Sequence, residues 1–202
     1  MTRAAADRVN EFAAAEIRNA LLGKRCWGAF MSFACTIGMD LGRKVPRDPQ
    51  AMAALDRSLA KLAKKRGRRR AARASRFVGE SHVIVWCSWR IEGRHGPIAS
   101  ADSDEKTCEQ AIARLTGKTM QHVDIQPGWN LRLAMTSGLV LNVFPDHVGE
   151  SASFDGNWEL WRPDQAFLIG TDLTCRVIDR ENRPMELRPE QGRWRVSEKV
   201  TT

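Results

Sequence analysis

The chain contains an internal repeat, and this feature restricts the possible folds more than any other. Its three landmarks are Leu22-Gly23-Lys24 with Leu115-Thr116-Gly117-Lys118, W-x-x-W-R at 86–90 with 158–162, and apolar segments ending in aspartate at 97–102 with 167–172. Because the landmarks recur in the same order, they predict two related halves. The first half is 21–105 and the second is 106–173, with an N-terminal helix at 1–20 and strands or a tail at 174–202.

Alternation of apolar and polar residues predicts antiparallel strands in both halves. The expected strands are 26–33, 36–41, 78–91 and 97–101 in the first half, and 119–125, 131–135, 139–144, 157–162 and 166–169 in the second. Residues 174–179 and 193–196 should add a hairpin or an edge. In the strand 119–125, Met120, His122 and Asp124 are expected on one face and Val123 and Ile125 on the other.

Helical spacing of apolar residues predicts a helix from Thr2 to about Leu22 and another over 105–115, capped by Ser103 or Asp104. A further helix should begin at Asp48-Pro49. The predicted fold class is therefore α+β: a mostly antiparallel sheet built from two duplicated meander halves, with an N-terminal helix and a helical basic insertion. The insertion is expected at 43–76, because the first half is about 22 residues longer between its landmarks.

The net charge of +8 is concentrated in one segment. Residues 61–76 hold nine cations and no acid: Lys61, Lys64, Lys65, Arg66, Arg68, Arg69, Arg70, Arg73 and Arg76. Phosphate contacts need Lys and Arg without a special order, so this run predicts binding to nucleic acid or another polyanion. A protein partner and a solvated loop with no specific role are the alternatives. The segment lacks aromatic anchors for a membrane surface, and no membrane partner is expected.

An apolar seam precedes the cationic run. Met52, Leu55, Leu59 and Leu62 follow one another at intervals of three, four and three residues, which is typical of a narrow coiled-coil stripe. The seam covers fewer than two heptads, which favours docking on the protein's own body over a free coiled coil. It is also the candidate anchor for a protein partner.

The two W-x-x-W-R motifs suggest either core positions or a binding surface. Residues three apart on a strand face opposite sides, so one tryptophan of each pair should enter the core. The functional interpretation is a surface of Trp89 and Trp161, with Arg90 and Arg162 available for phosphate or carboxylate. The structural interpretation, equivalent core and cover positions in a duplicated sheet, is the simpler one.

Other chemistry has weak support in the sequence. The five cysteines are odd in number and lack zinc-type spacing, which indicates mostly buried thiols and no metal site. His122 with Asp124 lacks further ligands nearby, and the acids at 102, 104 and 105 fit a helix start. No common nucleotide-binding, hydrolase or metalloprotease motif is present. We therefore expect no cofactor and no catalytic residue, and a cytoplasmic location because the first residues lack the apolar core of a signal peptide.

The pattern resembles a family of small uncharacterised bacterial proteins with a domain of unknown function. Members have two L-x-G-[KR]-x-V units that open strands, then a Trp-Glu-Leu step, a Pro-Asp turn and a final strand. The matching residues here are Leu22-Gly23-Lys24, Leu115-Thr116-Gly117-Lys118, Leu131-Arg132-Leu133, Gly138-Leu139-Val140-Leu141, Asn157-Trp158-Glu159-Leu160 and Pro163-Asp164. The match spans roughly 20–175; it lacks the family's terminal glycine pair after Ile169 and adds the basic insertion.

The resemblance implies a small accessory or immunity-type protein and supplies no catalytic residues. Together with the cationic run, it leads to the prediction of a non-catalytic accessory binding protein whose basic insertion contacts nucleic acid or another acidic partner. The alternatives are an immunity-type or assembly protein that binds a protein partner, and an enzyme whose catalytic site carries no recognised motif.

Overall fold

The computed structural model describes residues 3–31, 35–47, 76–146, 156–188 and 193–196. Its elements are α1 (Arg3–Leu21), β1 (Cys26–Met31), β2 (Ile37–Pro46), β3 (Phe77–Val85), β4 (Ser88–Gly93), β5 (Gly96–Ser100), α3 (Glu105–Ala113), β6 (Met120–Ile125), β7 (Leu131–Met135), β8 (Val140–Phe144), β9 (Trp158–Trp161), β10 (Gln165–Ile169), β11 (Cys175–Asp179), β12 (Met185–Arg188) and β13 (Arg193–Val196). The fold is α+β with antiparallel sheets, as predicted.

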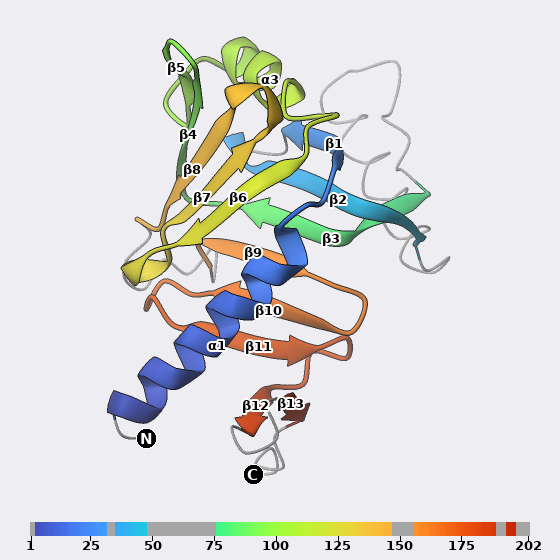
Figure 1. Cartoon of the computed structure of the whole chain (residues 1–202), viewed down its shortest axis with the longest axis vertical. Helices are drawn as coiled ribbons and strands as arrows, with labels where there is room; N and C mark the ends of the chain where they lie inside the picture. The colour runs from blue at the N-terminus through green and yellow to red at the C-terminus, as the bar shows by residue number, and fades with distance from the viewer. Residues whose placement is uncertain (1–2, 32–34, 48–75, 147–155, 189–192, 197–202) are drawn as a thin grey trace, which may run out of the picture.

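The chain builds two main sheets by crossing between them (Figure 1). It forms β1, β2 and β3 in one sheet, crosses to the other for β4 and β5, and continues there with β6, β7 and β8. It then returns to the first sheet for β9, β10 and β11. The orders are β1-β2-β3-β9-β10-β11 and β5-β4-β8-β7-β6, and β12 pairs with β13 separately. The first sheet is therefore completed by the three strands β9 to β11, and the second by the hairpin β4-β5.

The two Gly-Lys segments meet where β1 and β6 begin. Gly23 N–H donates to the Met120 carbonyl at 2.9 Å, and Gly117 N–H donates to the Cys26 carbonyl at 2.6 Å. Both glycines have a positive φ, +74° and +84°, which a residue with a Cβ rarely adopts. The Cys26 N–H donates to the Lys118 carbonyl, and the Met120 N–H donates to the Lys24 carbonyl. This reciprocal pattern fixes the starts of the two sheets against each other.

Both main sheets contribute to one hydrophobic core. Trp89 on β4 and Trp158 on β9 are its largest buried side chains, with 2% and 0% of their surface exposed. Each indole N–H finds a carbonyl partner inside the core: Trp89 donates to Cys35 at 2.8 Å, and Trp158 donates to Trp129 at 2.9 Å. These hydrogen bonds remove the cost of burying the polar edge of a large aromatic ring.

The two helices cover the open parts of this core. α1 buries Ala13, Ile17 and Leu21 and lies beside β6, whereas α3 lies beside β1 and β5 (Figure 1). The capping prediction for α3 is confirmed, because Asp104 accepts the Thr107 N–H at 3.0 Å. Within the described part of the chain, neither helix is long and apolar enough to cross a membrane.

Three strand predictions were wrong in ways that have physical causes. The segment 78–91 is two strands in different sheets, because the N–H groups of Trp86 and Cys87 both turn to the Asn157 carbonyl. A bulge between Met120 and His122 places Met120 in the core with Val123 and leaves His122 exposed. β2 continues past Leu41 to Pro46, so residues 43–46 belong to a strand and not to an insertion.

Most other local predictions are confirmed. β7, β8, β10 and the helix α3 lie within two residues of their expected bounds. Cys26, Cys87 and Cys108 are buried, and all five cysteines are free thiols. In the C-terminal part, β11 joins the main sheet at its edge, whereas β13 pairs with β12. The helix expected at Asp48-Pro49 lies outside the described residues.

Candidate polyanion-binding face and the adjoining cleft

The far end of the β2–β3 ladder carries a group of cations. The backbone brings them together: Gly42 N–H donates to the Arg25 carbonyl at 2.9 Å, and Arg47 N–H donates to the Arg76 carbonyl at 3.0 Å. We call this group the cationic rim, and its members are Lys24, Arg25, Arg43, Lys44, Arg47 and Arg76. Arg25, Arg43, Lys44 and Arg76 are exposed.

The rim depends on an irregularity in the ladder. The register shifts between Leu41 and Lys44, and Gly42 adopts a φ of +75° within this bulge. A Cβ on Gly42 would overlap the Glu80 side chain, which lies directly over the glycine. The bulge therefore turns Arg43 and Lys44 outward while leaving space for one carboxylate beneath them.

Glu80 is an acidic residue next to Lys24 and Arg43 of the rim, and these two cations balance its charge. Its carboxylate pairs with the ammonium of Lys24 and lies 3.8 Å from Nε of Arg43. The hydrogen bond from Lys24 is the main cause that holds the pKa of Glu80 below its usual value. Arg43 still exposes 82% of its side chain, so pairing leaves the rim strongly cationic.

A buried pair supports the rim from behind. Asp40 is 4% exposed, and its Oδ1 accepts the Gly79 N–H at 2.9 Å and lies 2.9 Å from Nδ1 of His82. Burial alone raises the pKa of Asp40, but the hydrogen bonds from His82 and Gly79 and the positive charge of Arg47 outweigh it and lower that pKa. Asp40 is thus an ionised acceptor at neutral pH, and it fixes β2 against β3 next to the rim.

A cleft of about 520 Å³ adjoins the rim between α1, β3 and the β9–β10 turn. Its lining includes Glu16, Asn19, Lys24, Arg43, Glu80, Ser81, Arg162 and Asp164. Lys24 and Arg43 are shared by the cleft and the rim. The acids of the cleft are paired: Glu16 accepts from Gln165 at 2.9 Å, and Asp164 lies 3.7 Å from Nε of Arg162. The cleft is formally neutral, whereas the rim is not.

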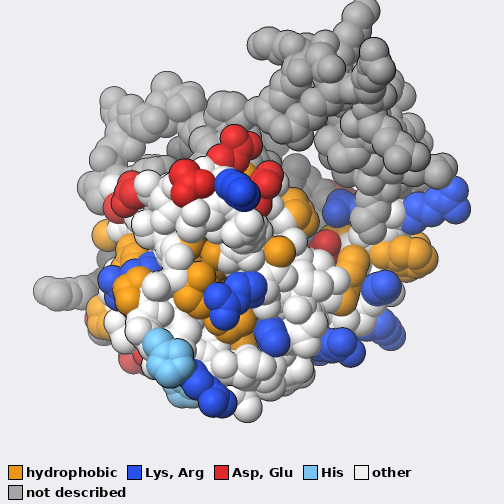
Figure 2. All heavy atoms as spheres, turned by 90° about the horizontal axis from the view of Figure 1, so that it is seen from above, with side chains coloured by type: hydrophobic (Ala, Val, Ile, Leu, Met, Phe, Trp, Pro, Cys, Tyr) orange, Lys and Arg blue, Asp and Glu red, His pale blue; other side chains and the backbone are white. Residues whose placement is uncertain are grey.

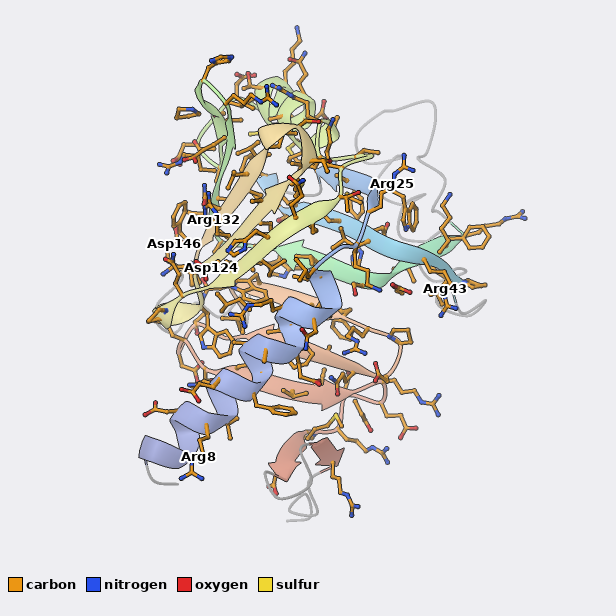
Figure 3. The ribbon with its side chains drawn as sticks, viewed as in Figure 1. Arg8, Arg25, Arg43, Asp124, Arg132 and Asp146 are labelled. Atoms are coloured by element: carbon orange, nitrogen blue, oxygen red, sulfur yellow. The ribbon has the colours of Figure 1, made fainter. Side chains whose placement is uncertain are left out.

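The charge is segregated over the described surface. In Figure 2, Asp and Glu side chains gather at the upper edge of the visible face, and most Lys and Arg side chains lie below and to the right. Figure 3 shows Arg25 and Arg43 on the side of β1, β2 and β3, with Asp124, Arg132 and Asp146 on the opposite side. The visible face is therefore uneven in charge, and two rim cations lie on the opposite side of the molecule from Asp124 and Asp146 (Figures 2 and 3).

Of the nine cations predicted from sequence, the structure describes Arg76, which is exposed and belongs to the rim. The other eight, Lys61 to Arg73, lie outside the described residues. The apolar seam Met52, Leu55, Leu59 and Leu62 lies outside them as well. The rim itself was missed by sequence reasoning, although Arg43, Lys44 and Arg47 stand close together in the chain.

The predicted tryptophan–arginine surface is corrected by the structure. Trp89 is 2% exposed in the core and cannot form part of a surface. Trp161 is half-buried on the other sheet, where its indole donates to Glu159 at 2.6 Å. Arg90 pairs with Glu92 at 2.6 Å and lies 5.7 Å from the ring of Phe144. Arg162 lines the cleft. The four residues therefore do not form one surface.

The Asp40–His82 pair was also missed. The two residues are 42 positions apart, and their contact depends on the β2–β3 register. The alternation of β3 signalled only that His82 and Ser81 face opposite sides. Within the described residues, no cluster of three or more His, Cys, Asp or Glu side chains could hold a metal ion.

None of the protein-family models matches this chain, and neither the curated proteins nor the solved structures contain a significant match. The functional argument therefore depends on the chemistry of the described surface.

Proposed function

We propose that this protein is a non-catalytic accessory binding protein that holds a nucleic acid on a cationic face. In this proposal the cations of the rim and those of the basic segment 61–76 both contact the nucleic acid. One observation carries the proposal: Arg47 and Arg76, the two described residues that flank the connection 48–75, are hydrogen-bonded to each other and belong to a surface that is already cationic.

The charge balance of the rim supports this partner class. The rim holds six cations, and the charge of the neighbouring acid Glu80 is taken up by two of them, Lys24 and Arg43. Arg25, Lys44 and Arg76 have exposed side chains that can exchange counterions for phosphates. Nothing in the described surface reads bases, so the contact would be sequence-independent, with a dissociation constant on the order of 10⁻⁴ to 10⁻⁶ M at physiological salt.

The fold is proposed to have arisen by duplication, which explains where the basic segment sits. Strand order supports this: β1-β2-β3 followed by β4-β5 has the same arrangement as β6-β7-β8 followed by β9-β10. The reciprocal bonds of Gly23 and Gly117 support it too. In this correspondence, the short turn 136–138 between β7 and β8 matches the long connection between β2 and β3 that carries the basic insertion.

The same correspondence corrects the alignment of the tryptophan motifs. Trp89 lies opposite Val143 on the third strand of its sheet, and Trp158 lies opposite Val85 on the third strand of the other sheet. The equivalent residues are thus Trp89 and Trp158, both of them buried. Alignment by the W-x-x-W-R letters instead pairs Trp86 with Trp158 and Trp89 with Trp161, which differs from the structural correspondence by three residues.

The test is binding of the full chain to labelled single- and double-stranded DNA and RNA across a salt series. A triple variant of the exposed rim, Arg25→Gln, Arg43→Gln and Arg76→Gln, should weaken binding to every sequence equally and reduce its salt dependence. The insertion variant Arg68→Gln, Arg69→Gln, Arg70→Gln and Arg73→Gln should do the same. Arg94→Gln, Arg114→Gln and Arg132→Gln remove the same charge from exposed positions away from the rim and serve as the matched control.

Binding that survives in both cationic-face variants, or falls equally in the control, would refute the proposal. A protein partner is the second candidate, and Phe77 at the start of β3 favours it, since 41% of this large apolar residue is exposed. An apolar contact of this kind would persist at high salt. If a partner binds independently of salt, and this binding is lost in the variant Leu55→Ser and Leu59→Ser, the insertion would be assigned to protein binding.

A further inference from the structure

Two free thiols from distant parts of the chain lie in contact. The Cys35 thiol points at the sulfur of Cys108, with the two Sγ atoms 3.7 Å apart. Cys35 precedes β2, and Cys108 lies in the first turn of α3. We propose that Cys35 and Cys108 form a reversible disulfide, a modification site that links the β1–β2 connection to α3.

The surroundings hold the backbone of Cys35 and the thiol of Cys108 in place. The Cys35 carbonyl accepts the indole N–H of the buried Trp89 at 2.8 Å, and the backbone of Cys35 has a φ of +62°. The Cys108 thiol lies 3.4 Å from the carbonyls of Ser100 and Ser103 at the start of α3. A disulfide needs a sulfur–sulfur distance of about 2.05 Å, so the pair must close by less than 2 Å, roughly what side-chain rotation supplies.

The two thiols differ in access, which sets the order of the reaction. Cys35 is partly exposed, whereas Cys108 has 0% of its surface exposed. Burial and the neighbouring Cys35 thiol raise the pKa of Cys108 to about 11. Cys35 is therefore the residue that an external oxidant reaches first, and Cys108 is the resolving thiol behind it.

The oxidant is a small-molecule disulfide such as glutathione disulfide. The Cys35 thiolate attacks one of its sulfurs, the S–S bond breaks, and one small thiol leaves with the electron pair. Cys108 then gives its proton to water and attacks the Cys35 sulfur, which expels the second small thiol. Two protein thiols are oxidised to one disulfide, and one external disulfide is reduced to two thiols.

The other three cysteines provide internal controls. Cys26 and Cys87 are buried and Cys175 is partly exposed, but the pKa of each of the three is raised to about 12 by desolvation, so little thiolate forms at neutral pH. Cys26 donates to the Gly28 carbonyl at 3.4 Å, not to a thiol. These three should remain reduced under conditions that oxidise the pair.

The experiment is incubation of the folded full chain in glutathione redox buffers, followed by alkylation and peptide mapping by mass spectrometry. We expect the loss of two alkylatable thiols and one linked peptide pair joining Cys35 to Cys108, reversed by dithiothreitol. Cys108→Ser should stop at one glutathione on Cys35, and Cys35→Ser should react with none. Cys175→Ser, the matched control, should form the link normally.

The proposal is overturned if the wild-type chain keeps all five thiols, if it stops at the glutathione adduct, or if another pair is linked. Wild-type mapping alone decides this, so it does not depend on the folding of the variants. As a second measurement, the oxidised chain should melt roughly 10 °C higher than the reduced chain, because the link closes a long loop. An unchanged or lowered melting temperature in linked protein would contradict the fixed geometry on which the proposal depends.

Discussion

Nδ1 of His82 lies 2.9 Å from Oδ1 of the buried Asp40, and the same oxygen accepts the Gly79 N–H. Replacing Asp40 by Ala leaves these donors without their acceptor, so we expect the free energy of unfolding to fall by about 2–3 kcal/mol. Urea denaturation measures the change. The exposed Asp102→Ala should change the same quantity by less than about 0.5 kcal/mol, and equal losses in the two variants would contradict the buried role of Asp40.

The stability of the protein should also depend on the charge of Asp40. Its pKa is lower in the folded chain than the ordinary value of 3.8, so its contribution to stability is complete above that value. The contribution is lost as pH falls through the folded pKa. We therefore expect unfolding free energies measured from pH 6 down to pH 2 to fall less steeply in Asp40→Asn than in the wild type. Parallel curves would show that Asp40 does not titrate differently in the two states.

Gly42 and Gly23 form a matched pair for testing the bulge that supports the rim. Both have a positive φ, +75° and +74°, but a Cβ would meet Glu80 only at Gly42. Alanine should cost about 1–2 kcal/mol at either site through backbone strain. Gly42→Ala should cost more, and it alone should weaken nucleic-acid binding, because the clash with Glu80 distorts the bulge that turns Arg43 and Lys44 outward. Thermal denaturation and the binding assay measure the two effects, and identical behaviour of both variants would refute this account.

The proposed equivalence of Trp89 and Trp158 has its own test. Trp158→Ala removes a side chain with 0% exposure and should cost about 3–5 kcal/mol, and Trp89→Ala should cost a similar amount. Trp86 and Trp161 are only partly buried, so their alanine variants should lose less. Chemical denaturation of the four variants gives the order. Large losses at Trp86 and Trp158, with small ones at Trp89 and Trp161, would restore the alignment by sequence letters.

The rim makes a quantitative prediction for salt dependence. Each phosphate contact contributes about 0.9 to the slope of log K against log salt for duplex DNA, so the triple variant of Arg25, Arg43 and Arg76 should lower that slope by roughly 2–3. The triple variant of Arg94, Arg114 and Arg132 should leave the slope unchanged. A fall in affinity with an unaltered slope would point to misfolding of the rim instead of lost phosphate contacts.

The parts of the fold that could be predicted are those that depend on neighbouring residues. β7 and β8 alternate clearly and are separated by Ser137-Gly138, so their bounds were accessible from local pattern. The cap of α3 at Asp104 was accessible for the same reason. The repeat also indicated that the two Gly-Lys segments are related, although not that they would bond to each other.

What could not be predicted depends on residues far along the chain. The segment from Val78 to Ile91 contains no turn signal. It is divided into two strands because the Asn157 carbonyl, some seventy positions away, accepts the N–H groups of Trp86 and Cys87. The extra residue in β6 is revealed only by its pairing with β7. The candidate site also depends on residues that are far apart in the chain. Pairing of β2 with β3 brings Asp40 next to His82, and the rim is formed by three separate segments.

The crossing of the chain between its two sheets has a consequence for biosynthesis. β3 pairs with β9, and β4 pairs with β8. Neither sheet can therefore form completely until most of the chain has left the ribosome. Contacts of such long sequence separation slow folding and leave strand edges unpaired in the meantime. A fragment ending before β9 would leave the β3 edge unpaired, which makes such fragments prone to aggregation.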